Sequence, residues 1–390
     1  MYKISKLNEI ASVIDEFLPA ERFDVQKEAA APDAILVRSA NMHEMPLGEN
    51  LLAVARAGAG VNNIPLDACA EKGVVVFNTP GANANGVKEL ILGTLITLSR
   101  NVVDAADWAK TLKGSGDAVG KMVEKGKNSF VGPEIKNKTL GVIGLGAIGT
   151  MVANDAHALG MKVLGYDPYI SVENAWRLSR GVRHCVELDQ LFGECDYITI
   201  HVPLIDSTKG LICAESIAKM KDGVRILNFA RGGLVKDDDL IAAVQSGKVA
   251  GYATDFPSDA LIGHKNILCI PHLGASTPEA EDNCARMAAK QLCDFLEYGN
   301  IKNSVNYPDC ELPHTGHYRL TLLHRNIANM VGQITSLLAK ENININNMIN
   351  KSRNAYAYTL LDLDDAPTAE AIERLNQIEG IIRVRAIDKK

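Results

Sequence analysis

Short apolar runs alternate with longer helical stretches over the first hundred residues. Runs at residues 34–37, 51–55 and 74–77 are rich in Ala, Val, Ile and Leu and stand between polar segments. Short, continuously apolar runs of this kind predict strands that are buried on both faces of a parallel sheet. From Glu89 to Lys110 the apolar residues recur at helical spacing, which predicts one long helix. This part of the chain is therefore expected to form an α/β domain.

One later strand ends in a glycine pattern that predicts a nucleotide site. Residues 140–149 read LGVIGLGAIG, an apolar strand that breaks into G-x-G-x-x-G and enters a helix over 150–159. In this pattern Gly144 allows the tight turn, and Gly146 lets the backbone approach a pyrophosphate. Gly149 lets the helix pack closely on the strand. The free N–H groups at the helix N-terminus, around Ala147 and Ile148, are expected to face the phosphates.

The strand that follows predicts which dinucleotide is bound. It covers residues 161–166 and is closed by Asp167. A carboxylate at this position accepts a hydrogen bond from the ribose 2′-OH and repels a 2′-phosphate, so the sequence favours NAD over NADP. The combination of strand, turn, helix, strand and acid is much more specific than the glycines alone.

The position of this unit predicts the domain organisation. About 140 residues precede it, and further strands at 197–200, 225–229 and 249–253 follow it, with a Gly- and Lys-rich loop predicted over 113–138. A long helix over 277–297 is expected to return to the first domain. We therefore predict a dinucleotide-binding domain inserted into an α/β domain. The predicted limits are 1–98 and 283–308 for the substrate-binding domain and 99–282 for the NAD-binding domain.

The last part of the chain has a different pattern. A Pro- and Gly-containing linker is predicted over 309–317, and residues 318–390 form a third domain. Strands at 318–323, 343–352, 356–363 and 381–386 and helices at 329–340 and 368–377 give the order βαββαβ, which is ferredoxin-like. Because this segment holds no obvious catalytic cluster, it is expected to serve dimerisation or regulation.

Composition narrows the possible partners. The chain has 390 residues, of which 47% are hydrophobic and 23% charged, and its net charge is −6 with the signs interspersed. This balance argues against nucleic acid or an anionic membrane as the main partner. No apolar run approaches membrane-spanning length, and the N-terminus lacks the apolar core of a signal peptide. The eight scattered cysteines predict reduced, mostly buried thiols in a cytoplasmic protein, and no metal site.

Polar residues that follow buried strands are the candidates for chemistry. Arg231 and His272 each follow a strand, and Asp255 and Asp259 lie between them. Ligands of open α/β sheets bind outside the carboxyl ends of the strands, so these side chains are expected to converge. Hydride transfer from an alcohol needs a base, which suits histidine, and a cation for the substrate carboxylate, which suits arginine. A carboxylate that fixes the histidine tautomer would complete the set.

Several motifs together resemble the D-2-hydroxyacid dehydrogenase family. They are GLGAIG at 144–149, NFARGG at 228–233, PHLGAST at 271–277, RAGAGVNN at 56–63 and NTPG at 78–81. The resemblance implies a Rossmann domain inserted into a flavodoxin-like domain, followed by a ferredoxin-like ACT domain. Within the family it is strongest to the enzymes that use NAD to oxidise 3-phospho-D-glycerate to 3-phosphohydroxypyruvate, the first step of L-serine biosynthesis.

The resemblance also implies roles for single residues. Arg231 would hold the substrate carboxylate, and His272 would be the general acid and base. The family's third catalytic residue is the glutamate of a D-V-F-x-x-E-P pattern, whereas residues 255–260 read DFPSDA, one residue shorter. Asp259 is the candidate for the acid that orients His272. Asp255 matches the aspartate that contacts the nicotinamide carboxamide, and which of the two acids reaches His272 stays open. Other implied cofactor contacts are Val202, Pro203, Phe229, His272 and Gly274.

Substrate and effector residues follow from the same resemblance. The backbone around Gly58 would bind the substrate carboxylate, and Arg38, Ser39 and Lys127 would face the phosphate. In the C-terminal segment, the residues that match an L-serine site are His324, Asn326 and Asn344. Ala328-Asn329 replaces the usual Pro-Gly there, which weakens the match. The long helix and the ACT-like segment predict a homodimer or homotetramer.

Two alternatives stay open. One is another D-2-hydroxyacid dehydrogenase that acts on glycerate or lactate. The other belongs to a different class, a non-catalytic NAD-sensing regulator with the same fold. The Arg231 and His272 pair favours an enzyme over the regulator.

Overall fold

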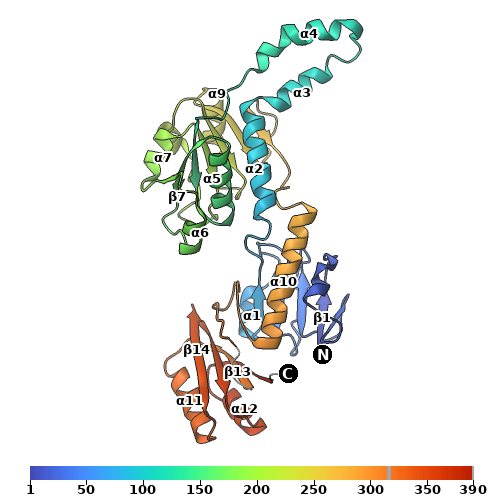
Figure 1. The fold of residues 1–390 in the computed structure, drawn as a ribbon, viewed down its shortest axis with the longest axis vertical. Coiled ribbons are helices and arrows are strands. Elements are labelled where there is room, and N and C mark those ends of the chain that lie inside the picture. The colour runs from blue at the N-terminus through green and yellow to red at the C-terminus, as the bar shows by residue number, and fades with distance from the viewer. Residues whose placement is uncertain (314–317, 389–390) are drawn as a thin grey trace. The chain divides into compact units, whose positions relative to one another are not determined.

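The computed structural model describes residues 1–313 and 318–388, and it divides into two compact units. Unit 1 comprises Met1–Ala82 and Glu281–Lys390, and unit 2 comprises Asn83–Ala280. Figure 1 shows the elements of each unit along the chain. Unit 2 is thus inserted into unit 1 in sequence, as expected from the late position of the glycine motif.

Unit 1 begins with a five-stranded parallel sheet in the order β2-β1-β3-β4-β5. This is the flavodoxin-like strand order, which confirms the predicted fold. The strands β1 and β2 were not predicted, because polar residues interrupt their apolar positions. The elements of this part are β1 (Tyr2–Lys6), η1 (Ser12–Glu16), β2 (Phe23–Gln26), β3 (Ala34–Val37), β4 (Ala53–Arg56), α1 (Leu66–Glu71) and β5 (Val75–Phe77).

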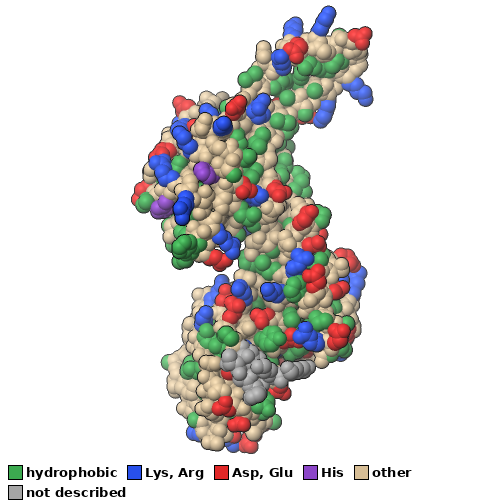
Figure 2. Space-filling view, viewed as in Figure 1, with side chains coloured by type: hydrophobic (Ala, Val, Ile, Leu, Met, Phe, Trp, Pro, Cys, Tyr) green, Lys and Arg blue, Asp and Glu red, His purple; other side chains and the backbone are tan. Residues whose placement is uncertain are grey.

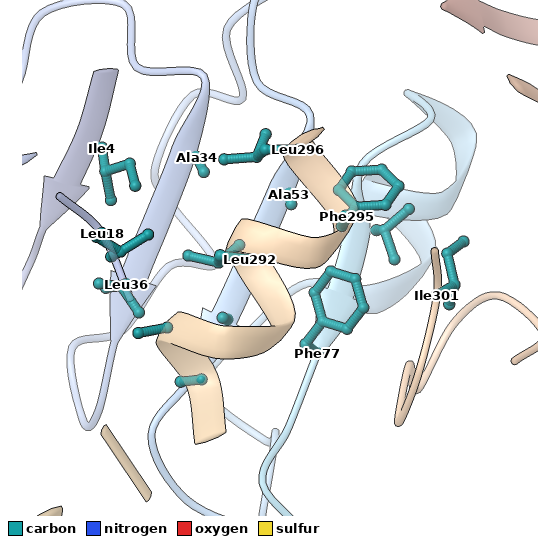
Figure 3. Packing of buried hydrophobic residues seen from close by; sticks show 14 of the residues in the cluster. Ile4, Leu18, Ala34, Leu36, Ala53, Phe77, Leu292, Phe295, Leu296 and Ile301 are labelled. Atoms are coloured by element: carbon teal, nitrogen blue, oxygen red, sulfur yellow. The ribbon is translucent and has the colours of Figure 1, made fainter. Parts of the chain in front are cut away.

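The long helix α10 (Pro278–Tyr298) supplies much of the core of this sheet. Its residues Leu292, Phe295 and Leu296 are buried with Leu36 and Phe77 of the strands, as Figure 3 shows. The rings of Phe77 and Phe295 lie 5.6 Å apart and are tilted by 60°. Each large apolar side chain buried in this way contributes about 1.5–3 kcal/mol. The helix therefore ties the C-terminal half of unit 1 to its N-terminal sheet.

The C-terminal segment forms a four-stranded antiparallel sheet in the order β14-β15-β13-β16. Its helices pack on one face, where Leu320, Leu322 and Leu361 meet Ile334 and Leu338. The order βαββαβ with this strand arrangement confirms the predicted ferredoxin-like domain. Its elements are β13 (Tyr318–Arg325), α11 (Met330–Lys340), β14 (Ile345–Arg353), β15 (Tyr356–Leu363), α12 (Ala369–Asn376) and β16 (Ile381–Asp388).

The opposite face of this sheet packs onto α10. Leu323, Tyr358 and Leu360 belong to the same buried cluster as Phe295. Alternate residues of a strand face opposite sides, so β13 places Leu322 toward the helices and Leu323 toward α10. The two sheets of unit 1 therefore share a continuous apolar core.

Polar side chains of the C-terminal sheet cap the end of α10. Arg385 donates to the Leu296 carbonyl at 2.9 Å, and Arg319 donates to the Tyr298 carbonyl at 2.8 Å. The last carbonyls of a helix lack partners within the helix, and cations near them are stabilising. Arg319 also pairs with Asp362 at 2.7 Å, and both side chains are 0% exposed. This buried ion pair lies at the junction of the sheet with the helix.

Unit 2 contains a seven-stranded parallel sheet in the order β12-β11-β10-β9-β6-β7-β8. Counted from β6, this is the Rossmann order with one added strand, which confirms the predicted class. The strands are β6 (Thr139–Ile143), β7 (Lys162–Tyr166), β8 (Val182–His184), β9 (Tyr197–Ile200), β10 (Val224–Asn228), β11 (Val249–Thr254) and β12 (Ile267–Cys269). The helices from α5 onward are α5 (Ala147–Ala158), α6 (Val172–Arg177), α7 (Leu188–Glu194), α8 (Ala214–Ala218) and α9 (Asp237–Gln245).

Two predictions about the helices of unit 2 are wrong. The expected helix over 89–110 is two helices, α2 (Ala84–Ser99) and α3 (Val102–Lys110), because Asn101 between them is left-handed with φ 50°. The expected loop over 113–138 contains η2 (Gly116–Ala118), the helix α4 (Val119–Gly126) and η3 (Lys127–Phe130). Glycines at both ends of α4 lower its intrinsic helix propensity, which hid it from sequence patterns. Figure 1 shows α3 and α4 projecting from the rest of unit 2.

The predicted domain limits at residues 98 and 283 stay a prediction. The structure adds that α2 belongs with unit 2, since Val87, Ile91 and Leu95 are buried with Val142 of β6. The predicted linker over 309–317 lies partly outside the described residues.

Candidate active site

The glycine loop after β6 leaves open space at the N-terminus of α5. Gly144 has φ +92°, and a Cβ on it would lie 2.8 Å from the carbonyl carbon of His201. A Cβ on Gly149 would lie 1.9 Å from the Gly144 oxygen. At Gly146, by contrast, a Cβ would meet no atom within 4 Å. Two glycines are thus required by packing. The third, next to the free N–H groups around Ala147 and Ile148, leaves the space that a pyrophosphate needs.

Asp167 is fixed beside this loop. It directly follows β7, and its Oδ2 accepts from the Leu145 backbone N–H at 2.8 Å. Its Oδ1 accepts from the Tyr169 backbone N–H at 2.9 Å. Each carboxylate oxygen can accept a further hydrogen bond, so the side chain can still bind a ribose hydroxyl. The glycine loop and this acid together fit NAD.

The segment after β9 lies against the same loop. The Val202 Cγ1 would be 2.9 Å from a Cβ on Gly144. His201, which the sequence analysis missed, places Nε2 2.9 Å from the Thr199 hydroxyl. Burial lowers the pKa of His201 to about 3, so its imidazole is neutral near pH 7. Its position directly after a buried strand was the available signal.

The other predicted cofactor contacts are spread over unit 2. Pro203 is exposed, just after the half-buried Val202. Phe229 is 5% exposed and belongs to the sheet core, so its side chain serves packing. Gly274 is buried, and a Cβ there would come within 3.2 Å of the Val87 side chain.

The carboxyl ends of β10, β11 and β12 surround a pocket of about 410 Å³. Its lining includes Asn228, Gly232, Asp237, Asp255, Ser258 and His272. The prediction that polar residues after these strands converge is therefore met for Asp255 and His272. Arg231 follows β10, is exposed, and donates from Nη1 to the Ala230 carbonyl at 2.6 Å.

Asp255 is the buried acid of this pocket. It is 2% exposed, and its Oδ1 has no hydrogen-bond partner among the described residues. Burial raises the pKa of the Asp255 carboxyl above its usual range, and the positive charges of His272 and Arg231 act in the opposite direction. The ring of Phe256 packs against that of His272, with centroids 4.7 Å apart and a tilt of 57°.

Asp259 has a different environment. It is exposed and does not line the pocket. The preceding Ser258 donates its hydroxyl to Asp237 Oδ2 at 2.6 Å, and Leu261 is 2% exposed. These two anchors hold the loop between them so that Asp259 lies at the surface. The role of Asp259 stays a prediction.

The predicted substrate residues of unit 1 lie around two arginines. Arg38 pairs with Glu281 of α10 at 2.6 Å, and its carbonyl accepts from Arg56 Nε at 3.1 Å. Arg56 Nη1 would be 2.3 Å from a Cβ on Gly58, so its guanidinium lies over that glycine. The backbone N–H of Gly58 itself donates to the Thr79 hydroxyl at 2.8 Å. Arg56 was not predicted, although it opens the RAGAGVNN motif.

Ser39 and Lys127 have other partners. The Ser39 backbone N–H donates to Asn8 Oδ1 at 3.0 Å. Lys127 begins η3 in unit 2, where it is exposed and pairs with Glu124.

The three effector candidates do not gather in one chain. His324 is 1% exposed, and its ring nitrogens lie 2.8 Å from the Arg325 carbonyl and 2.9 Å from the Thr359 hydroxyl. Asn326 lies just past the end of β13. Asn344 donates to Asp364, and the residue before Asp364 pairs with the first residue of β13. Asn344 therefore lies near the start of the same strand. A strand of this length spans about 25 Å, at 3.3 Å per residue.

Within residues 1–313 and 318–388, no group of three or more His, Cys, Asp or Glu side chains could hold a metal ion. None of the helices in the same ranges is both long and apolar enough to cross a membrane.

Comparisons with known proteins agree with this fold. Residues 92–274 match the family described as D-isomer specific 2-hydroxyacid dehydrogenase, NAD binding domain. The D-3-phosphoglycerate dehydrogenase of Haemophilus influenzae is 32% identical over 355 residues, which cover 86% of this chain and 81% of that protein. The enzyme of the same name from Rattus norvegicus is 41% identical over 283 residues, 70% of this chain and 50% of the relative. The chain thus spans about half the length of the rat relative it matches.

A solved structure extends the comparison. The NAD+-bound 3-phosphoglycerate dehydrogenase of Entamoeba histolytica has a TM-score of 0.60 and 31% identity, covering 78% of this chain and 98% of that one. The chain therefore belongs to the family of D-isomer specific 2-hydroxyacid dehydrogenases. Within it, this chain is a homologue of the D-3-phosphoglycerate dehydrogenases.

Proposed function

We propose that the protein is an NAD-dependent D-3-phosphoglycerate dehydrogenase. It oxidises 3-phospho-D-glycerate to 3-phosphohydroxypyruvate, the first step of L-serine biosynthesis. The observation that carries the proposal is the pocket of unit 2, where His272 and Asp255 follow the strands of a Rossmann sheet with an intact glycine loop. The eight free cysteines suit the cytoplasm, where thiols stay reduced.

The residues of unit 2 suit the chemistry of the reaction. NAD, held by Gly144, Gly146, Gly149 and Asp167, supplies the hydride acceptor when bound. The His272 imidazole takes the proton of the C2 hydroxyl, and histidine suits this task because it titrates near neutral pH. The planar guanidinium of Arg231 binds the substrate carboxylate through two parallel hydrogen bonds.

The residues of unit 1 give the preference for a phosphorylated substrate. Arg38 and Arg56 are joined by the 3.1 Å hydrogen bond and adjoin the Gly58 loop. Two guanidinium groups suit a phosphate dianion, since arginine matches phosphate oxygens in charge and geometry. Ser39 and Lys127 stay proposed phosphate contacts.

Replacing Arg56 tests this preference. Arg56→Met is expected to raise KM for 3-phospho-D-glycerate about 10- to 100-fold, because a charged hydrogen bond contributes about 1.5–3 kcal/mol. KM for D-glycerate, which lacks the phosphate, should change by less than about threefold. Steady-state rates with both acids measure the two values. Arg22→Met, at a surface pair with Glu297, is the matched control. Equal losses on both acids would contradict the assignment.

The helices α3 (Val102–Lys110) and α4 (Val119–Gly126) form a projecting arm of unit 2 (Figure 1), and this arm supports self-association. Exposed apolar residues gather on it, namely Val102, Val103, Val119, Met122 and Val123. Figure 2 shows hydrophobic side chains there among lysines. Contiguous apolar patches on a surface mark interaction sites. A second copy of the chain is the partner that we propose for the arm, which gives a homodimer or, with a further contact, a homotetramer.

We further propose L-serine as an effector, with Asn326 and Asn344 as its contacts. Because these residues lie at opposite ends of β13, one serine meets both only across two chains. The edge strand β14 allows this, since antiparallel pairing of two β14 strands sets the start of one beside the end of the other. In this arrangement the His324 ring bonds to Arg325 and Thr359 within the sheet and does not contact the ligand. L-serine should slow the wild type but not Asn344→Ala, and identical curves for the two would remove the effector.

A further inference from the structure

We propose that Asp255, rather than Asp259, is the carboxylate that positions His272. The importance of this Asp255 role for turnover rests on the proposed function. The positioning itself is a property of the free protein and can be tested without any substrate. Two carboxylates follow β11 within five residues of each other, and they have opposite environments.

The environment of Asp255 calls for a partner. The side chain is buried, and its Oδ1 is enclosed without a hydrogen bond among the described residues. A buried carboxylate oxygen without a donor is unfavourable, so such groups in folded proteins usually have a functional explanation. The charged groups that act on it are His272 and Arg231. The other acid of the pocket, Asp237, accepts from Ser258.

Of these two residues, His272 is the one that shares the pocket lining with Asp255. Its ring is held on one side by Phe256, the residue directly after Asp255. Phe256 itself is tied to the strand end, since its backbone N–H donates to the Thr254 hydroxyl at 3.1 Å. The unsatisfied carboxylate and the imidazole therefore line the same pocket, in which the ring can donate to the carboxylate.

The loop geometry favours Asp255 over Asp259 for this role. Ser258 is bound to Asp237, and the backbone N–H groups of Leu261 and Ile262 both donate to the Ser258 carbonyl. This short turn buries Leu261 and leaves Asp259 exposed. The segment is one residue shorter than the D-V-F-x-x-E-P pattern. The aspartate at the strand end, Asp255, therefore lines the pocket, whereas the loop aspartate, Asp259, does not.

Positioning has a chemical purpose. A neutral histidine carries its proton on one of two ring nitrogens, and the hydrogen bond of one nitrogen decides the state of the other. If one nitrogen donates to Asp255, the other is left as an acceptor for the hydroxyl proton of the substrate. Without the carboxylate, both tautomers are populated and the ring is free to turn.

The test is the tautomer of His272 in the protein without substrate or NAD. In protein labelled with ¹⁵N-histidine, the His272 signals are identified by their loss in His272→Gln. At a pH where the ring is neutral, the wild type and Asp259→Asn should each show one dominant tautomer. Asp255→Asn should show a mixture, and Asp255→Glu should restore the single form. A mixture in Asp259→Asn with an unchanged Asp255→Asn would overturn the proposal.

Kinetics provide the second readout. Asp255→Asn is expected to lower kcat for 3-phospho-D-glycerate about 10²- to 10⁴-fold, the range of a general base that has lost its correct state. KM should change much less, and Asp255→Glu should regain part of kcat. Asp238→Asn, an exposed acid of α9, is the matched control. If the wild type does not oxidise this acid at all, the proposed function fails, while the tautomer experiment still decides the role of Asp255.

Discussion

Replacing His272 by glutamine is expected to lower kcat for 3-phospho-D-glycerate oxidation about 10²- to 10⁴-fold. Glutamine keeps a hydrogen-bonding side chain of similar reach but cannot take up a proton near neutral pH. The glycine loop and Asp167 bind the cofactor without His272, and glutamine keeps a polar contact at position 272, so the dissociation constant for NADH should change by less than about tenfold. Steady-state rates give the first value, and the fluorescence of bound NADH gives the second.

A second histidine serves as the control for this result. His184 is exposed at the end of β8, and His184→Gln should keep the wild-type kcat. If His272→Gln also turned over at the wild-type rate, His272 would not be the base. The alternative of an NAD-sensing regulator would then gain support, since such a protein needs NAD binding but no proton transfer.

Removing the charge of Asp362 is expected to destabilise unit 1 strongly. Asp362→Asn leaves the Arg319 guanidinium, which is 0% exposed, without its counter-ion. Breaking a fully buried pair by removing one partner destabilises a protein by about 3–5 kcal/mol. The midpoint of urea unfolding, followed by a probe in the C-terminal sheet, measures the loss.

Two further variants separate charge burial from packing. The double variant Arg319→Met with Asp362→Leu removes both charges and should recover more than half of the loss. Recovery is incomplete because the Tyr298 carbonyl loses its donor. Glu173→Ala, at an exposed pair with Arg177, should change stability by less than about 1 kcal/mol. An Asp362→Asn protein as stable as the wild type would show that the guanidinium is not desolvated.

The sequence predicted the parts of the fold that are set by local patterns. Fully buried strands such as β3 and β6 have continuous apolar runs, and the glycine loop has a fixed spacing. The strands β1 and β2 escaped because polar positions interrupt them, and α4 escaped because its glycines weaken the helical pattern. The packing of the C-terminal sheet on α10 could not be predicted either. It depends on contacts such as Arg385 with Leu296, which are far apart in sequence.

In the candidate site, too, local sequence patterns predicted some residues, whereas others depend on contacts made only in the folded chain. Position after a strand was enough to predict that Asp255 and His272 line one pocket, whereas Arg231 does not line it. Position alone could not decide between Asp255 and Asp259, because the direction of each side chain depends on the anchor between Ser258 and Asp237. Arg56 was missed because its orientation over Gly58 is a property of the folded loop. The matched His324 turned out to be buried with both nitrogens bonded, which no sequence pattern could indicate.

The most direct test of the proposed function is the ratio of kcat/KM for 3-phospho-D-glycerate to that for D-glycerate, measured by NADH formation at saturating NAD. With Arg38 and Arg56 both engaged by the phosphate, we expect the phosphorylated acid to be preferred at least about 100-fold, since each charged hydrogen bond contributes about 1.5–3 kcal/mol. A ratio near one, or turnover of D-glycerate without turnover of 3-phospho-D-glycerate, would contradict the proposal.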